Sequence, residues 1–255
     1  MQNSKEFKSF AKQLAHISGD VIKRYFRTPV SIDSKSDNSP VTIADKKAEE
    51  LMRAAIMKHY PDHGIIGEEF GIENPAAEYK WILDPIDGTK SFICGTITFG
   101  TLIALTHNGE PILGVINQPV MNEFLIGDNS SALLNGENVS VRTCDSIMNA
   151  VLLTADHLNV GKYQDGKKFD ELISRVKIYR GWGDCYGYYL LATGYADIVV
   201  DPIMSVWDSM ALIPVVKGAG GVITDWQGND AITGNSIIAS SGNLHSIVIQ
   251  ELNQV

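Results

Sequence analysis

The sequence lacks the features that mark several large classes of protein. Its three cysteines, Cys94, Cys144 and Cys185, are widely spaced, which argues against a disulfide framework and against a cysteine-based zinc site. No apolar run approaches the length that spans a bilayer, and the first residues form no apolar signal core. Basic residues are few, 21 against 30 acidic ones, and form no block that would bind nucleic acid or an anionic membrane. We therefore expect a cytoplasmic protein with neither kind of partner.

The composition is that of a globular protein. Hydrophobic residues make up 44% of the 255 residues and charged residues 20%, with a formal net charge of −9. A chain of this length can bury a large core, in one unit or in two closely packed halves. An acidic protein can still bind an anionic substrate if bound metal ions reverse the local charge.

Two helices are predicted in the first 60 residues. Apolar residues recur at steps of three and four over about residues 5–27, which predicts a helix with one apolar face. Thr42 followed by Asp45 is typical of a helix start, and the apolar spacing continues this second helix to about residue 59. The polar segment 31–40 between them predicts an exposed loop or hairpin.

The rest of the chain changes from mostly β to alternating strands and helices near residue 148. The strand-like runs are 81–83, 100–105 and 112–116, with a turn at 107–109, and the clearest later helices are roughly 184–193 and 208–218. We expect an α/β fold in which residues 1–148 form an α+β half and residues 149–255 an α/β half.

The most informative stretch is Asp84-Pro85-Ile86-Asp87-Gly88-Thr89, directly after an apolar strand. Ligands usually bind at the end of such strands, and a helix starting at Thr89 would offer its free N–H groups to a phosphate. Gly88 would let the backbone approach that ligand closely. Asp84 and Asp87 repel one another unless a cation lies between them, and hard oxygen ligands favour Mg²⁺. An Asp-Gly turn with capping aspartates is the alternative.

Three further acids favour a metal site over a simple turn, although each of them alone has an ordinary structural explanation. Glu68 follows the apolar pair Ile65-Ile66 and could lie in a solvated loop. Asp208 precedes a helical pattern and could be its N-cap, and Asp45 in a first helical turn is favoured by the helix dipole without any function.

Taken together, these segments resemble the inositol monophosphatase superfamily of lithium-sensitive metal phosphatases. The matching segments are Ser39–Asp45, Gly67–Glu69, Trp81–Phe92 and Trp207–Gly221, in this order along the chain. The resemblance implies a layered α/β/α/β/α sandwich, commonly a homodimer, that hydrolyses a small phosphate monoester with a metal-activated water. It implies two or three Mg²⁺ per active site.

The resemblance also assigns roles to residues of this sequence. The implied metal ligands are Glu68, Asp84, the Ile86 carbonyl, Asp87 and Asp208, with Asp84 between two ions. The implied catalytic residues are Glu68, Thr89 and Asp45, with Asp45 just outside the ligands, and Gly88 and Thr89 would bind the phosphate. The N-terminal half thus carries most of the ligands, and the C-terminal half carries Asp208 and the residues that select the substrate.

Histidinol phosphate is the favoured substrate. Lys90-Ser91, the segments around Asp184 and Asp201, and Pro214 resemble the histidinol-phosphatase branch more than the inositol branch. Two carboxylates outside the metal site suit a leaving group with an ammonium or imidazolium charge. Capping roles for both acids are equally open, as are inositol 1-phosphate or another small polyol phosphate as the substrate. A non-catalytic metal-binding regulator on the same fold is the alternative class.

Two other motif interpretations fail on particular residues. Asp87-Gly88-Thr89 matches the end of the haloacid-type phosphatase motif, but Pro85 stands where that motif has its nucleophilic aspartate. The glycine-rich segment 217–221 follows a predicted helix, so it indicates a helix end and not a nucleotide-binding loop.

Overall fold

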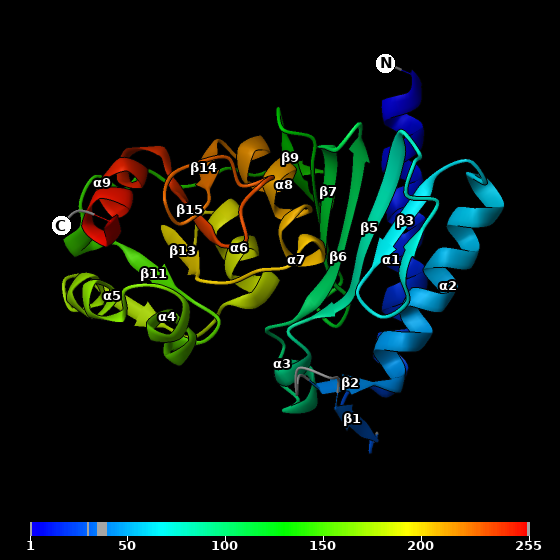
Figure 1. Ribbon diagram of the computed structural model, residues 1–255, viewed down its shortest axis with the longest axis horizontal. Coiled ribbons are helices and arrows are strands. Elements are labelled where there is room, and N and C mark those ends of the chain that lie inside the picture. The colour runs from blue at the N-terminus through cyan, green and yellow to red at the C-terminus, as the bar shows by residue number, and fades with distance from the viewer. Residues whose placement is uncertain (1, 30, 35–39, 254–255) are drawn as a thin grey trace.

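The computed structural model describes residues 2–29, 31–34 and 40–253, and it has five layers (Figure 1). Two helices cover one face of a large sheet, three helices lie between the large sheet and a smaller one, and three more cover the outer face of the smaller sheet. The predicted α/β/α/β/α sandwich is confirmed. Residues 35–39 of the predicted loop at 31–40, including Ser39, lie outside the described residues.

The large sheet has eight strands in the order β10-β9-β8-β7-β6-β5-β3-β4. Its strands are β3 (Gly64–Gly67), β4 (Gly71–Glu73), β5 (Tyr79–Asp87), β6 (Gly100–His107), β7 (Glu110–Gln118), β8 (Glu123–Gly127), β9 (Ala132–Leu134) and β10 (Glu137–Asn138). Only the β3–β5 pair is parallel among the pairs of this sheet in the described ranges. The predicted hairpin turn between β6 and β7 forms at Asn108-Gly109, where both residues have positive φ, as a tight two-residue turn requires.

Helices α1 (Gln2–Tyr25) and α2 (Ile43–His59) pack on the outer face of the large sheet, around the buried Trp81. The predicted start of α2 is confirmed by a reciprocal cap. The Thr42 hydroxyl accepts the Ala44 N–H at 3.1 Å, and the Asp45 carboxylate accepts the Thr42 N–H at 2.9 Å. A short antiparallel pair, β1 (Ile32–Ser34) and β2 (Pro40–Thr42), precedes α2.

The smaller sheet has five strands in the order β12-β11-β13-β15-β14. These are β11 (Val151–Leu153), β12 (Ile178–Arg180), β13 (Ile198–Asp201), β14 (Gly221–Thr224) and β15 (Ile237–Ser241), and β11, β12 and β13 run parallel. The helices between the sheets are α6 (Asp184–Ala192), α7 (Val206–Ser209) and α8 (Leu212–Gly218), and those on the outer face are α4 (His157–Tyr163), α5 (Gly166–Ile173) and α9 (Gly242–Asn253). The remaining short helices are α3 (Thr89–Ile93) and the 3₁₀ turn Ile147–Asn149.

The predicted helix over residues 208–218 is wrong, because the structure has two helices there, α7 and α8. The break falls at Met210 and Ala211. Pro214 has no N–H to donate to the carbonyl of Met210, and its ring would clash with that carbonyl in a continuous helix. Asp208 is the third residue of α7 and lies in its first turn. The glycine at position 220 adopts φ +81° after α8, so the predicted helix end is confirmed.

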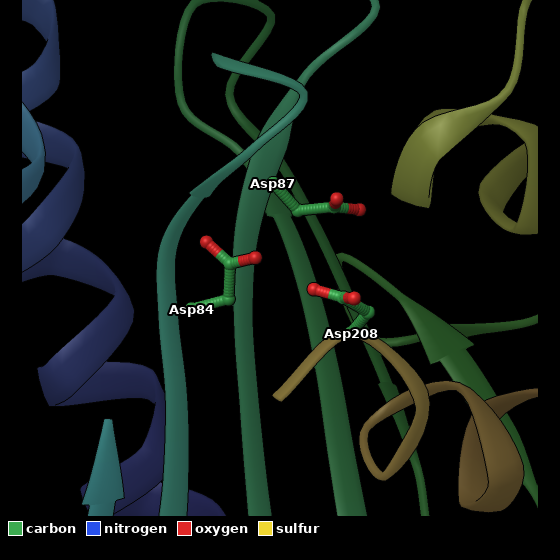
Figure 2. Close-up of side chains that lie close together, drawn as sticks. All are labelled: Asp84, Asp87 and Asp208. Carbon is green, nitrogen blue, oxygen red and sulfur yellow. The ribbon is translucent and has the colours of Figure 1, made fainter. Parts of the chain in front are cut away.

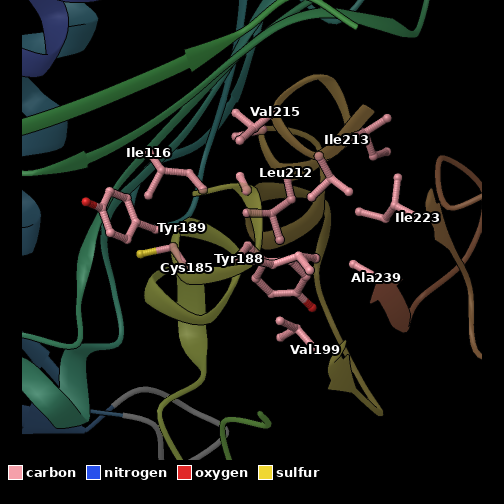
Figure 3. Packing of buried hydrophobic residues seen from close by; sticks show 14 of the residues in the cluster. Ile116, Cys185, Tyr188, Tyr189, Val199, Leu212, Ile213, Val215, Ile223 and Ala239 are labelled. Carbon is pink, nitrogen blue, oxygen red and sulfur yellow. The ribbon is translucent and has the colours of Figure 1, made fainter. Parts of the chain in front are cut away.

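The layer between the sheets holds the core that joins them (Figure 3). Side chains from α6 and α8, such as Tyr188 and Leu212, pack between Ile116 of the large sheet and Val199 and Ala239 of the smaller one. Because one core connects both sheets, the division of the chain into halves near residue 148 stays a prediction. Within the described residues, none of the helices could span a bilayer.

His245 of α9 provides a pH-dependent contribution to stability. Its ring nitrogens lie 2.9 Å from the Thr224 hydroxyl and 3.1 Å from the Ser240 hydroxyl, and burial lowers its pKa to about 4. Between pH 6.5 and 4 the unfolded chain binds a proton that the folded chain does not, so stability is lost as the pH falls.

We expect this histidine to remove about 2 kcal/mol of stability between pH 7 and pH 5. His245→Gln keeps polar partners for both hydroxyls but does not titrate. In urea unfolding, the stability difference between wild type and variant should therefore shift by that amount in favour of the variant at pH 5. A difference that is the same at both pH values would contradict the assignment.

Candidate active site

A bulge in β5 brings Asp84 and Asp87 to the same side of the large sheet. In a regular strand, residues three apart point to opposite faces. Here Asp84 pairs with Leu102 and Asp87 with Gly100, so β5 gains one residue over its partner. Pro85 lies within the bulge, where a missing N–H costs no ladder hydrogen bond, and its carbonyl accepts the Thr101 hydroxyl at 2.9 Å.

Asp208 reaches the same place from α7. It is not the N-cap of its helix. It is the third residue of the first turn, where its carboxylate accepts the Ser205 N–H at 2.7 Å. One oxygen from each of Asp84, Asp87 and Asp208 lies within 4.8 Å of the others. Figure 2 shows the three carboxyl groups directed toward one shared space.

The electrostatics of this cluster favour a bound cation. Burial raises the pKa of Asp84 well above its ordinary value, and the charge of Glu68 raises it further, as do those of Asp87 and Asp208. Oδ1 of Asp84 is buried and has no hydrogen-bond partner among the residues that the structure describes. A buried carboxylate oxygen without a partner is costly. An all-oxygen donor set around such an atom fits Mg²⁺.

Glu68 and Asp84 are brought together by the parallel pairing of β3 with β5. Gly67 pairs with Leu83, and the Glu68 N–H donates to the Leu83 carbonyl at 3.2 Å. Glu68 lines a cavity of about 300 Å³ together with Gly88 and Thr89. The structure therefore brings all four predicted carboxylate ligands to one region.

Thr89 connects the cluster to α2 through its hydroxyl. This hydroxyl lies 3.0 Å from the Ile86 carbonyl and 3.3 Å from Oδ1 of Asp45. Asp45 is completely buried, and its other oxygen accepts the N–H and the hydroxyl of Thr42. Asp45 is therefore both a helix-capping residue and the acceptor behind Thr89.

The N-terminus of α6 brings Asp184 to the cavity wall, next to Gly88. Asp184 has φ +50°, an uncommon conformation for a residue with a Cβ. A Cβ on Gly88 would lie 2.9 Å from Oδ2 of Asp184, so the glycine leaves room for this carboxylate. Burial raises the pKa of Asp184 to about 6, against the opposing charge of Lys90. The next residue, Cys185, donates its N–H to Asp87 and so fixes that carboxylate.

Asp201 does not line the cavity, unlike the sequence-based expectation. It is the last residue of β13, only 5% exposed, and its oxygens accept the Ala155 N–H at 3.0 Å and the Tyr188 hydroxyl at 2.8 Å. Burial raises its pKa to about 7. Through its hydrogen bond with the Ala155 N–H, Asp201 positions a residue that does line the cavity.

Several residues of the cavity wall were not predicted from the sequence. Asp156, the N-cap of α4, and Asn159 within α4 both line the cavity, and Lys90 Nζ lies 4.0 Å from Oδ2 of Asp156. A signal for Asp156 was available, since it caps a helix directly after the strand β11, at the same sheet edge as the ends of β12 and β13.

Known proteins of one family resemble this chain in sequence and in fold. The profile of the inositol monophosphatase family matches residues 3–255. The chain is 45% identical to the bifunctional phosphatase IMPL2 of Arabidopsis thaliana over 244 residues, which cover 93% of this chain and 70% of that protein. It is 39% identical to a histidinol-phosphatase of Chlorobaculum parvum over 236 residues, which cover 91% of each. An inositol monophosphatase from Zymomonas mobilis superposes with a TM-score of 0.87 at 38% identity, covering 97% of this chain and 98% of that one. The chain therefore belongs to the inositol monophosphatase family of phosphatases.

Proposed function

We propose that this protein is a Mg²⁺-dependent phosphatase that hydrolyses histidinol phosphate. The observation that carries the metal dependence is the unpartnered, buried Oδ1 of Asp84 between three other carboxylates. The residues proposed to hold two or three Mg²⁺ are Glu68, Asp84, the Ile86 carbonyl, Asp87 and Asp208. Mg²⁺ would stabilise negative charge on the phosphoryl oxygens and make a water molecule more acidic.

The chain's own groups can orient the attacking water and move its proton. When the Thr89 hydroxyl donates to Asp45 or to the Ile86 carbonyl, its lone pairs are free to accept a hydrogen bond from a water in the cavity. Glu68, on the same cavity wall, would accept the proton of that water. The N–H groups of Gly88 and Thr89 would bind the phosphoryl oxygens as charge develops there.

The proposed substrate follows from carboxylates of the cavity wall that are not among the proposed metal ligands. Asp184 and Asp156 line the cavity together with Asn159. Carboxylates in this position suit a leaving group that carries an ammonium or imidazolium charge. We keep Asp184 as the substrate-binding residue and propose that Asp201 acts through Ala155. The similarity to the Chlorobaculum histidinol-phosphatase supports this choice.

Replacing Asp184 with Asn tests the substrate. We expect kcat/KM for histidinol phosphate to fall by about 10- to 150-fold, the effect of losing a charge-assisted hydrogen bond of about 1.5–3 kcal/mol. Hydrolysis of glycerol 2-phosphate should change little, because its uncharged alcohol makes no such contact. Steady-state kinetics on both substrates measure the difference. Equal losses on both would show that Asp184 acts on the metal site or the fold.

Inositol 1-phosphate is the second candidate, because the chain also resembles the Zymomonas inositol monophosphatase at 38% identity. Wild-type kcat/KM values for inositol 1-phosphate and histidinol phosphate decide between them. A non-catalytic regulator on this fold would release no phosphate from either compound. A homodimer, a cytoplasmic location and inhibition by lithium stay predictions.

A further inference from the structure

We propose that Glu49, paired with Arg53, is a positioning residue that sets the metal affinity of the site by fixing the turn that carries Glu68. The proposal rests on the proposed role of Glu68 as a Mg²⁺ ligand. Glu49 and Arg53 lie one turn apart on α2 and do not line the cavity with Glu68. Their contacts nevertheless hold the residues that follow Glu68.

The turn in question joins β3 to β4 with only three residues, 68–70. The side chain of Glu49 accepts the N–H of Glu69 at 2.8 Å and the N–H of Phe70 at 3.1 Å. These are the two backbone groups directly after Glu68. The N–H of Glu68 itself donates to the Leu83 carbonyl of β5 at 3.2 Å. Two of the three turn N–H groups therefore depend on a side chain from another element.

The backbone leaves space for Glu49 at one particular residue. A Cβ on Gly67 would lie 2.0 Å from Oε1 of Glu49, well inside van der Waals contact. Glycine at position 67 therefore allows the carboxylate to reach the turn, and no larger residue could stand there without moving it. The close approach makes the position of the turn depend on the position of Glu49.

Arg53 makes it possible to bury the Glu49 charge. Glu49 has no exposed surface, and a buried carboxylate is tolerated when it is paired and hydrogen-bonded. Nε of Arg53 donates to Oε1 of Glu49 at 2.8 Å, and its guanidinium also donates to the Gly71 carbonyl, at the far end of the turn. The ion pair thus contacts both the N–H groups inside the turn and the carbonyl that follows it.

The same face of α2 contacts the site twice. Asp45 lies one turn before Glu49 and approaches the Thr89 hydroxyl at 3.3 Å. Residues four apart lie above one another on a helix, so one rigid element holds both Thr89 and the Glu68 turn. Groups that orient metal ligands from behind typically change metal affinity by 10- to 100-fold when they are removed.

The test measures Mg²⁺ binding by calorimetry with EDTA-stripped protein. In Glu49→Gln, one acceptor oxygen is replaced by an NH₂ group that faces a backbone donor. We expect the Mg²⁺ dissociation constant to rise about 10-fold or more. Glu50→Gln is the matched control, since Glu50 is the next residue on α2, is exposed and pairs with Lys47 at 2.7 Å. Its dissociation constant should equal that of wild type.

A double-mutant cycle separates positioning from a general structural effect. If Glu49 acts through Glu68, Glu49→Gln should weaken Mg²⁺ binding in the wild type but add nothing in a Glu68→Ala background. An equal loss in both backgrounds, or no loss in the wild type, would overturn the proposal. If Glu49→Gln does not fold, Arg53→Lys decides in the same cycle, because it keeps the charge but loses the guanidinium contact to Gly71.

Failure of the underlying function would look different. If Glu68 is not a metal ligand, Glu68→Ala alone will bind Mg²⁺ as the wild type does. If Glu68→Ala weakens binding but Glu49→Gln and Arg53→Lys do not, only the positioning role is wrong.

Discussion

Replacing Asp84 with Asn is expected to lower the rate of phosphate release about a thousandfold or more, with the fold intact. Asp84 lies close enough to Glu68, Asp87 and Asp208 for the charge of each to raise its pKa. Asparagine keeps its shape but removes the negative charge, and its NH₂ group would direct a donor at the bound cation. Catalysis should therefore lose its main source of electrostatic stabilisation.

The stability of the metal-free variant provides a second readout. Without metal, Asp84 is a buried acid next to like charges, so removing its charge relieves repulsion. We expect the thermal midpoint of EDTA-treated Asp84→Asn to equal or exceed that of the EDTA-treated wild type. Asp62→Asn, in an exposed turn, is the control for the loss of one charge. Near-normal turnover in Asp84→Asn would show that Asp84 is not an essential metal ligand.

Local sequence patterns were sufficient to predict two of the elements that carry the site, α2 and β5. The reciprocal cap of Thr42 and Asp45 and the apolar run before Asp84 depend on neighbouring residues only, and both form as expected. The split between α7 and α8 was missed, although Pro214 was a visible signal for it. The apolar spacing is helical both before and after the break, so it predicts one continuous helix unless the effect of the proline is considered.

The relative placement of the side chains could not be predicted in the same way. The bulge that turns Asp87 to the side of Asp84 depends on the pairing of β5 with β6, which no local pattern specifies. Asp184 and Asp201 looked equivalent in the sequence. In the structure Asp184 lines the cavity, whereas Asp201 accepts hydrogen bonds from Ala155 and Tyr188. The difference arises because distant parts of the chain decide which side chain is buried.

Glu49 and Arg53 illustrate the same limit. A glutamate followed four residues later by an arginine is typical of a solvated helix surface, where such a pair contributes little. In the structure Glu49 is completely buried against a turn of the large sheet. Only the packing of α2 distinguishes this pair from the exposed Lys47–Glu50 pair beside it.

Removal of the metal is expected to abolish nearly all phosphatase activity. Without a cation, the four carboxylates of the site repel both one another and an anionic substrate. We expect EDTA-treated protein to retain on the order of 1% of its activity or less, since the main stabilisation of the phosphoryl charge is gone. Ca²⁺ should not substitute for Mg²⁺, because its longer and looser coordination would not hold the reacting oxygens in place.

The measurement is phosphate release from histidinol phosphate by EDTA-stripped protein, titrated with Mg²⁺. We expect almost no release before Mg²⁺ is added, and full recovery with a saturating dependence on the Mg²⁺ concentration. Asp84→Asn should stay inactive across the same titration. Full phosphate release by the stripped protein, with no response to Mg²⁺, would contradict the assignment of these carboxylates as a metal site.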